Sequence, residues 1–156
     1  MKFLILHGPN LNLFGRREPH IYGTTTLAEI NQKLHLLAGE LGVELEIIQS
    51  NHEGALVDKL HERIDDVQGA LLNPAGLTQH GVSLHDAIKA MPFPMLEIHM
   101  SNIGAREPWR HHSIISPAVK ATIQGLGWRS YTAGLRALVE IVREQRDMDC
   151  GESPVA

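Results

Sequence analysis

Residues 2–23 read KFLILHGPNLNLFGRREPHIYG and contain the stretch that indicates the fold most directly. The apolar run over residues 2–7 predicts a buried strand, and the threonines at 24–26 are typical of a helix start. A strand and the next helix are normally joined by about two to six residues, but here the polar segment 7–23 separates them. A long polar loop in this position usually carries function. The stretch therefore predicts a strand–loop–helix unit whose loop forms part of a site.

The same order of elements repeats along the chain. The helix over residues 26–41 has the clearest signals, because Thr26 and Glu29 are spaced as a capping box and leucines recur every three or four residues before Gly42. The predicted strands cover residues 2–7, 43–49, 67–73, 94–100 and 121–126, and the other helices cover 54–65, 81–91 and 130–146. This alternation predicts an α/β fold, a flavodoxin-like doubly wound five-stranded parallel sheet. We expect residues 1–146 to form a single catalytic α/β domain and residues 147–156 a polar C-terminal tail.

The composition argues against several classes of partner. With 156 residues, 43% of them hydrophobic, a net charge of −4 and a pI near 6.2, the chain has no electrostatic basis for binding nucleic acid or a membrane surface. No apolar run approaches the roughly 18 residues of a spanning helix, and no signal-peptide pattern precedes the first strand. The single cysteine, Cys150, cannot form an internal disulfide, so we expect a cytoplasmic protein.

Polar residues gather where the predicted strands end. In a doubly wound sheet, ligands bind beyond the carboxyl ends of the strands. Asn10, Arg17 and Tyr22 follow the first predicted strand, Asn73 ends the third, and His99 lies near the end of the fourth. Turn chemistry alone explains any one of these clusters. Their coincidence at one edge of the sheet favours a site there.

Motifs for common cofactors and nucleophiles are missing from this edge. The first loop begins Gly8-Pro9-Asn10 and lacks the GxGxxG of a dinucleotide site, and no GxxxxGK[ST] phosphate loop is present. The ten histidines form no metal-binding motif such as HExxH. Cys150 lies in the predicted tail, GxSxG is absent, and no lysine falls at the polar edge, which argues against nucleophilic and Schiff-base catalysis. We therefore expect no cofactor and no metal.

Acid–base chemistry by Tyr22 and His99 is the remaining interpretation. A free tyrosine titrates near about 10, so it acts as a base at neutral pH only beside a cation, which Arg17 could supply. Glu97 and His99 are two residues apart on one predicted strand and share a face, which suits His99 as the acid. The alternative is that Tyr22 only packs and His99 only fills a strand end. Further arginines near this edge, at positions 106 and 110, suit a carboxylate or phosphate ligand and favour the acid–base interpretation.

Four stretches of the chain resemble the type II 3-dehydroquinate dehydratases. They read GPNLNLFGRREPHIYG, ALLNPAGLT, EIHMSNIGAREPWRHHS and VKATIQGLGWRSYTAGLRAL, and the resemblance extends over nearly all of residues 1–142. It implies a flavodoxin-like domain that assembles into a homo-oligomer, a dodecamer built from trimers. It also implies the dehydration of 3-dehydroquinate to 3-dehydroshikimate without cofactor or metal, in the shikimate pathway or in quinate catabolism.

The resemblance further implies roles for individual residues. Tyr22 matches the family's tyrosinate base, Arg17 the arginine that activates it, and His99 the acid that protonates the departing hydroxyl. Asn10 and Glu97 match residues that position a water molecule and stabilise the enolate. The substrate-binding positions fall on Asn73, Met100, Ser101, Arg110 and, reaching in from an adjacent subunit, Asp86.

Two positions depart from the family's pattern. The family usually has a histidine where this chain has Gln79, and another where it has Gly104. Gln79 can exchange hydrogen bonds with a ligand but cannot carry a proton, and a one-residue shift of the loop would bring in His80 instead. Both residues are therefore candidates for substrate binding. The alternatives to a dehydratase are a paralogue acting on a related cyclic hydroxy-acid and a non-catalytic protein that binds a small carboxylate.

Overall fold

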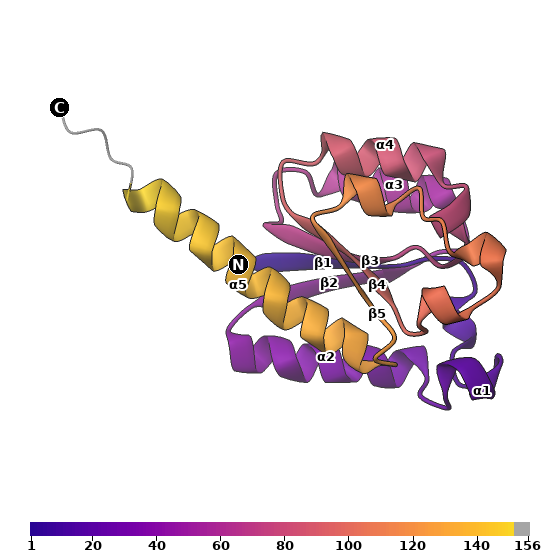
Figure 1. The fold of residues 1–156 in the computed structure, drawn as a ribbon. Helices are drawn as coiled ribbons and strands as arrows, with labels where there is room; N and C mark the ends of the chain where they lie inside the picture. Colours follow the sequence, from indigo (N-terminus) through magenta and orange to yellow (C-terminus); the bar gives the residue numbers. More distant parts are fainter. Residues whose placement is uncertain (152–156) are drawn as a thin grey trace.

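Five parallel strands form one sheet in the computed structural model, which describes residues 1–151. Hydrogen bonding places the strands in the order β2-β1-β3-β4-β5, and every neighbouring pair is parallel (Figure 1). This is the flavodoxin-like doubly wound order, so the predicted fold class is confirmed. The strands are β1 Lys2–His7, β2 Glu44–Gln49, β3 Gly69–Asn73, β4 Met95–His99 and β5 Ala121–Gln124.

Helices cover both faces of the sheet. The helices are α1 Pro19–Tyr22, α2 Leu27–Leu41, α3 Glu53–Glu62, α4 Val82–Ala90 and α5 Arg129–Gly151. Helices α2 and α5 pack on one face, whereas α3 and α4 pack on the other (Figure 1). No long helix joins β4 to β5; that connection contains three 3-10 turns, Ile103–Ala105, Pro108–Arg110 and Ser116–Ala118.

The start of α2 forms as its sequence predicts. Thr26 Oγ1 accepts a hydrogen bond from the Glu29 backbone N–H at 3.2 Å, and Glu29 Oε2 accepts one from the Thr26 backbone N–H at 2.7 Å. This capping box satisfies backbone donors that a helix start otherwise leaves unpaired. The helix ends at Gly42, whose φ of 65° is a left-handed conformation that glycine adopts without strain.

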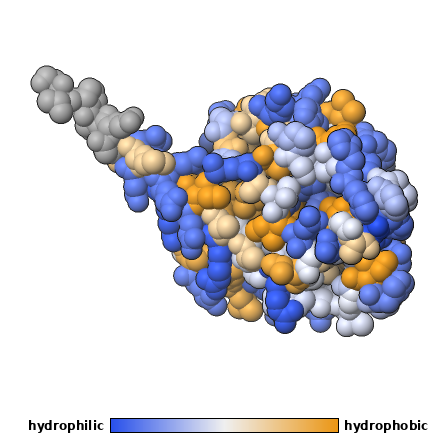
Figure 2. Space-filling model, viewed as in Figure 1, coloured by the Kyte–Doolittle hydropathy of each residue, from blue (hydrophilic) through white to orange (hydrophobic). Residues whose placement is uncertain are grey.

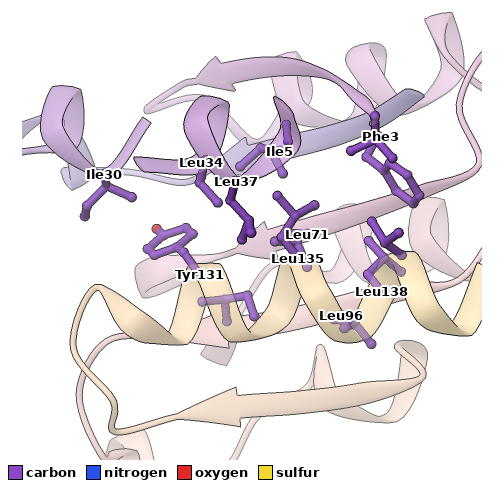
Figure 3. Packing of buried hydrophobic residues seen from close by; sticks show 14 of the residues in the cluster. Phe3, Ile5, Ile30, Leu34, Leu37, Leu71, Leu96, Tyr131, Leu135 and Leu138 are labelled. Atoms are coloured by element: carbon purple, nitrogen blue, oxygen red, sulfur yellow. The ribbon is translucent and has the colours of Figure 1, made fainter. Parts of the chain in front are cut away.

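The core consists of an apolar layer on each face of the sheet. On the α2–α5 face, Leu34 of α2 and Leu135 of α5 belong to one buried cluster with Phe3 and Leu71 of the central strands (Figure 3). A second buried cluster lies between the sheet and the α3–α4 layer. Strands β1 and β3 are almost fully buried because helices cover both of their faces.

Strands β1 and β3 end side by side. The Gly8 N–H donates a hydrogen bond to the Asn73 carbonyl oxygen at 2.8 Å. A Cβ atom at position 8 would lie 2.6 Å from the Pro74 carbonyl oxygen. Glycine is therefore needed here, because any larger residue would push the two strand ends apart.

Two segments differ from the prediction. The long loop after β1 contains a 3-10 turn, Leu11–Leu13, and the single turn of α1, both too short to produce a periodic apolar pattern. The last helix, predicted over residues 130–146, continues to Gly151, so the first part of the predicted tail 147–156 is helical. The apolar repeat stops at Val142 and provides no signal for these polar turns. The rest of the predicted tail, residues 152–156, lies outside the described residues.

The surface mixes polar and apolar residues over the face seen in Figure 2. The C-terminal part of α5 extends beyond the sheet, and its Met148 side chain is 63% exposed (Figure 1). Within residues 1–151, no helix combines the length and the hydropathy needed to cross a membrane.

Candidate active site

A cavity of about 150 Å³ opens at the carboxyl ends of β1, β3 and β4. Doubly wound sheets bind ligands in this position. The predicted site residues that line it are Asn10, Arg17, Tyr22, Asn73, Gln79, His99, Met100, Ser101 and Arg110. A larger depression of about 690 Å³, at the amino-terminal ends of β4 and β5, contains none of them. The cavity at the carboxyl ends is therefore the candidate active site.

Glu97 and His99 form a hydrogen-bonded pair on β4, at the base of the cavity. Glu97 Oε1 lies 2.6 Å from His99 Nε2, and the Glu97 side chain is fully buried. The same carboxylate accepts hydrogen bonds from Ser113 Oγ at 3.1 Å and Ser116 Oγ at 2.6 Å. A buried carboxylate needs such donors to offset the loss of water. Glu97 does not line the cavity itself and is linked to it through its contact with the His99 imidazole.

Tyr22, in the single turn of α1, faces the cavity from the long loop. Its phenolic oxygen accepts a hydrogen bond from Arg106 Nη1 at 2.8 Å. The Arg17 guanidinium carbon lies 5.7 Å from the centre of the Tyr22 ring, and Arg17 Nε pairs with Glu18 Oε2 at 3.0 Å. The cation at the hydroxyl is therefore Arg106, where the sequence predicted Arg17. A guanidinium at hydrogen-bond distance stabilises negative charge on the phenolic oxygen.

Two buried polar atoms beside the cavity have no hydrogen-bond partner among the described residues. They are Gln79 Oε1 and Arg106 Nη2. The amide orientation of Gln79 is set because its Nε2 donates to the Arg110 carbonyl oxygen at 3.2 Å. Unpaired buried polar atoms are rare in folded proteins. An acceptor and a cationic donor next to one cavity suit a ligand that carries both hydroxyl and carboxylate groups.

Asn73 ends β3 beneath the cavity and is anchored at both amide atoms. Its Oδ1 accepts a hydrogen bond from the Ala75 N–H at 3.2 Å, and its Nδ2 donates to the Tyr131 hydroxyl at 2.9 Å. The same hydroxyl lies 3.1 Å from His7 Nδ1. Burial raises the pKa of Tyr131, an effect that the hydrogen bond from Asn73 only partly offsets, and burial lowers the pKa of His7 to about 4. Both groups are therefore uncharged at neutral pH.

Comparison with known proteins identifies the family of this chain. The family model described as dehydroquinase class II matches residues 1–139. The chain belongs to the class II dehydroquinase family. Among curated relatives, the 3-dehydroquinate dehydratase of Desulforudis audaxviator is 51% identical over 142 residues, which cover 91% of this chain and 95% of that protein. The 3-dehydroquinate dehydratase of Gloeobacter violaceus is 47% identical over 151 residues, which cover 97% of this chain and 94% of that protein.

Solved structures support the same assignment. The type II dehydroquinase from Propionibacterium acnes superposes on this class II dehydroquinase with a TM-score of 0.86 and 40% sequence identity, over 89% of this chain and 96% of that one. The type II dehydroquinase from Butyrivibrio crossotus superposes with a TM-score of 0.87 and 34% identity, over 88% and 97% of the two chains. The family resemblance predicted from the four sequence stretches is confirmed.

Two predicted substrate-binding residues of this class II dehydroquinase lie outside the cavity of their own chain. The 3-10 turn Ala75–Gln79 ends with Gln79 at the cavity, and His80, the next residue, is exposed and does not line it. Gln79 therefore occupies the cavity position in this structure, and a contribution of His80 to substrate binding stays a prediction. Asp86 is exposed on α4, where its Oδ1 lies 2.9 Å from His85 Nδ1. Its expected contribution to a neighbouring subunit stays a prediction.

Several residues and contacts of the site were not predicted from the sequence. Arg106 was counted among the arginines near the edge, but nothing in its spacing linked it to Tyr22, which is 84 positions away. Trp109 lines the cavity and is 60% exposed. Ser113 and Ser116 hold Glu97 from the connection between β4 and β5. Serines in a loop are common, so only the folded chain shows which carboxylate they contact.

Within residues 1–151, the structure places no group of three or more His, Cys, Asp or Glu side chains so that they could hold a metal ion. The Cys150 thiol is exposed and does not line the cavity. The expectation that the reaction needs no cofactor stays a prediction.

Proposed function

We propose that this class II dehydroquinase dehydrates 3-dehydroquinate to 3-dehydroshikimate through an enolate, with Tyr22 as the base and His99 as the acid. The observation that carries the proposal is the pairing of these two side chains at one cavity. Tyr22 has the Arg106 guanidinium at 2.8 Å from its oxygen, and His99 has the Glu97 carboxylate at 2.6 Å from its nitrogen. Family membership supports the choice of substrate, since the relatives named above are 3-dehydroquinate dehydratases.

The reaction removes water from the carbon β to a ketone. Tyr22, as phenolate, takes a proton from the carbon next to the ketone, and the electron pair moves onto the ketone oxygen as an enolate. The enolate then re-forms the ketone and pushes out the β-hydroxyl, which leaves as water after accepting a proton from His99. Tyr22 ends with one proton more and His99 with one fewer, so both are restored through solvent before the next turnover. Asn10 lines the same cavity and is the proposed partner of a water molecule at the enolate oxygen.

The remaining side chains of the cavity are proposed to hold the substrate. The product carries a carboxylate, and Arg110 and Arg106 supply positive charge at the cavity. Gln79 Oε1 is an unpaired acceptor that suits a substrate hydroxyl, and Ser101 and Asn73 offer further polar contacts. Met100 is 4% exposed and forms part of the apolar wall of the cavity. Such a cavity distinguishes a polar cyclic acid from an apolar ring.

An absorbance assay tests the proposal directly. The product contains a carbon–carbon double bond conjugated to its ketone and absorbs in the ultraviolet, whereas the substrate does not. We expect the purified protein to produce this absorbance from 3-dehydroquinate without added metal or cofactor. Binding of 3-dehydroquinate without turnover would identify a small-carboxylate binding protein instead. Turnover of a related cyclic hydroxy-acid but not of 3-dehydroquinate would identify a paralogue.

We further propose that the loop carrying Arg17 and Tyr22 closes over bound substrate. The loop must admit a polar ligand and then exclude water from the reacting atoms. Its glycines, Gly15 with a φ of 86° and Gly23 with a φ of 76°, lie on either side of these two residues. Backbone amides of the loop should exchange hydrogen more slowly when a substrate analogue is bound. Equal exchange with and without the analogue would count against closure.

We also propose that the active unit is an oligomer, a dodecamer built from trimers. Asp86 is exposed on α4 and lies outside the cavity of its own chain, as a residue that completes a neighbour's site would. Sedimentation should show the enzyme as an oligomer under assay conditions, and Asp86→Ala should weaken substrate binding. A fully active monomer would refute the shared site.

A further inference from the structure

Four polar side chains form a hydrogen-bonded row beneath the cavity. Asn31 of α2 contacts His7 of β1 through Asn31 Oδ1 and His7 Nε2 at 2.9 Å. His7 Nδ1 lies 3.1 Å from the hydroxyl of Tyr131 on α5, and this hydroxyl accepts from Asn73 Nδ2 at 2.9 Å. His7 and Tyr131 are both fully buried, and Asn73 is 3% exposed. Only Asn73 reaches the cavity.

The donors and acceptors of this row follow from one fixed point. The Ala75 backbone N–H can only donate, so the Asn73 atom that it contacts at 3.2 Å is the amide oxygen. The amide nitrogen of Asn73 therefore faces Tyr131, whose oxygen accepts. The Tyr131 hydroxyl proton must then go to His7 Nδ1, the other polar atom within reach. His7 is consequently a neutral imidazole protonated at Nε2, which donates to Asn31 Oδ1.

A protonated His7 would break this order. Both ring nitrogens would then donate, and the Tyr131 hydroxyl proton would have no acceptor in a fully buried environment. The lowered pKa of His7, caused mainly by burial, agrees with the neutral form. The row therefore has a single consistent pattern of donors and acceptors. Each side chain donates to the next one, from Asn73 through Tyr131 and His7 to Asn31 of α2.

We propose that His7 and Tyr131 are positioning residues, which hold the Asn73 side-chain amide in the one orientation that presents its free N–H to the substrate. This inference rests on the proposed function, in which Asn73 contacts the substrate. Two of the three hydrogen-bonding atoms of the Asn73 amide group, its oxygen and one N–H, are already used by Ala75 and Tyr131. The second N–H is the one left for a ligand in the cavity. Without the Tyr131 hydroxyl, the amide nitrogen loses its anchor and can tilt about the contact to Ala75.

A role in stability alone does not explain the row equally well. Two apolar side chains of similar shape would fill this buried space without any need for matched polar partners. The row instead links the cavity to both helices of one face, α2 and α5, through side chains that do not touch the cavity. His7 and Asn73 are also direct partners in the β1–β3 register. Strand pairing therefore fixes the backbone positions of the two residues that the Tyr131 hydroxyl connects.

The first test removes the hydroxyl that anchors Asn73. Tyr131→Phe should raise the KM for 3-dehydroquinate roughly fivefold, the effect of one misplaced hydrogen bond, with kcat changed less than about twofold because no proton transfer involves Asn73. The matched control is Ser130→Ala. Ser130 is also fully buried and its Oγ accepts a hydrogen bond from the Leu126 N–H at 3.2 Å, away from the row. Ser130→Ala should leave KM unchanged even if it lowers the melting temperature.

A double-mutant cycle separates positioning from general loosening of the fold. If Tyr131 acts on the substrate only through Asn73, then Asn73→Ala and Asn73→Ala/Tyr131→Phe should have the same KM. Additive increases in KM would mean that Tyr131 affects binding by another route. That result would overturn the proposal.

Two substitutions of His7 test the direction of the row. The side-chain oxygen of asparagine can take the place of Nδ1, so His7→Asn keeps an acceptor for Tyr131 and loses the contact to Asn31. The amide nitrogen of glutamine can take the place of Nε2, so His7→Gln keeps the donor to Asn31 and leaves Tyr131 without an acceptor. We expect KM near the wild-type value for His7→Asn and a KM raised as in Tyr131→Phe for His7→Gln.

The outcomes of these experiments are distinct. Equal KM values in the two His7 variants, or a wild-type KM in Tyr131→Phe, would overturn the positioning role while leaving the dehydratase intact. Should Tyr131→Phe fail to fold, the His7 pair decides alone. A wild-type protein that does not convert 3-dehydroquinate would instead refute the proposed function, and the positioning role with it.

Discussion

The floor and the rim of the cavity are built in different ways. The floor consists of four buried polar side chains at or near the carboxyl ends of three strands. They are His7 (0% exposed), Asn73 (3%), Glu97 (0%) and His99 (8%). The rim consists of partly exposed side chains from loops and turns; they are Arg17, Tyr22, Gln79, Arg106 and Arg110. Floor side chains are held by strand geometry and by hydrogen bonds within the chain, whereas two rim side chains keep buried polar atoms, Gln79 Oε1 and Arg106 Nη2, that have no partner among the described residues.

This difference indicates which part of the site is complete before a ligand arrives. The hydrogen bonds that hold Asn73 and the Glu97–His99 pair form within the chain, so these side chains are oriented before a ligand arrives. The rim contains a donor and an acceptor without partners among the described residues, and a ligand would satisfy them. Truncation of a floor side chain to alanine should therefore lower both stability and activity, and changes in the rim should lower activity with little effect on stability.

The largest expected effect is at Tyr22. Tyr22→Phe should lower kcat by about a thousandfold, within the range of general acid–base catalysis, because phenylalanine cannot take a proton. The free energy of unfolding should change by less than about 0.5 kcal/mol, as for a partly exposed loop residue. Absorbance kinetics, calorimetric binding of a substrate analogue and urea unfolding measure the three quantities. Substantial turnover in this variant would show that Tyr22 is not the base.

Glu97→Ala should lower both the stability and the activity of the protein. It would remove the partner of His99 and leave the hydroxyls of Ser113 and Ser116 without their acceptor. We expect a loss of about 3 kcal/mol in the free energy of unfolding and a fall in kcat of about a hundredfold. Glu140→Ala is the control, because Glu140 is an exposed carboxylate on α5. A loss of unfolding free energy no larger than that of the control would mean that the hydrogen bonds of the Glu97 carboxylate do not stabilise the fold.

The floor should also respond to acid through His7. Its pKa lies at about 4 in the folded protein and at 6.5 when the ring is in water, so the unfolded chain binds the extra proton first as pH falls. Stability is therefore unaffected above pH 6.5 and declines between pH 6.5 and about 4. At about 1.4 kcal/mol per pH unit, the full decline amounts to about 3 kcal/mol. Urea unfolding at equal protein concentration should show a decline that is larger in the wild type than in His7→Asn by the His7 contribution, whereas equal declines would mean that His7 is not the titrating group.

Two arginines of the rim should stabilise the negative charge of the Tyr22 phenolate during the reaction. The guanidinium carbons of Arg17 and Arg106 lie 5.7 and 5.4 Å from the centre of the Tyr22 ring. Arg17→Ala and Arg106→Ala should each lower kcat by about ten- to thirtyfold, since positive charge favours the phenolate. Arg16→Ala is the matched control, because Arg16 is exposed, adjacent in sequence and absent from the cavity lining. Wild-type kcat in either test variant would remove that arginine from the proposed mechanism.

The smallest expected effect separates Gln79 from its neighbour. Gln79→Ala should raise KM by about three- to tenfold, because one hydrogen bond to the substrate is lost. His80→Ala should leave KM unchanged, since His80 is exposed and does not line the cavity. Steady-state kinetics of the two variants are sufficient. The reverse order of effects would mean that the turn 75–79 rearranges when the substrate binds.

Regular elements could be predicted closely where local patterns carry the information. The capping box of Thr26 and Glu29 marked the start of α2, and the apolar runs marked all five strands to within a few residues. The single turn of α1 and the extension of α5 to Gly151 were missed, because neither has an apolar repeat. In the site, most predicted residues lie at one cavity, since parallel strands bring their carboxyl ends to the same edge.

By itself, the sequence determined the class of fold, the edge of the sheet that carries the site, and the candidates for base and acid. These follow from periodicity and from residue types at strand ends, which are local properties of the chain. Only the tertiary structure decided that Arg106 meets the Tyr22 hydroxyl, that Gln79 and not His80 reaches the cavity, and that Tyr131 connects His7 to Asn73. Partners 84, 124 and 58 positions apart are brought together by packing of whole helices and strands, and no local spacing records such contacts.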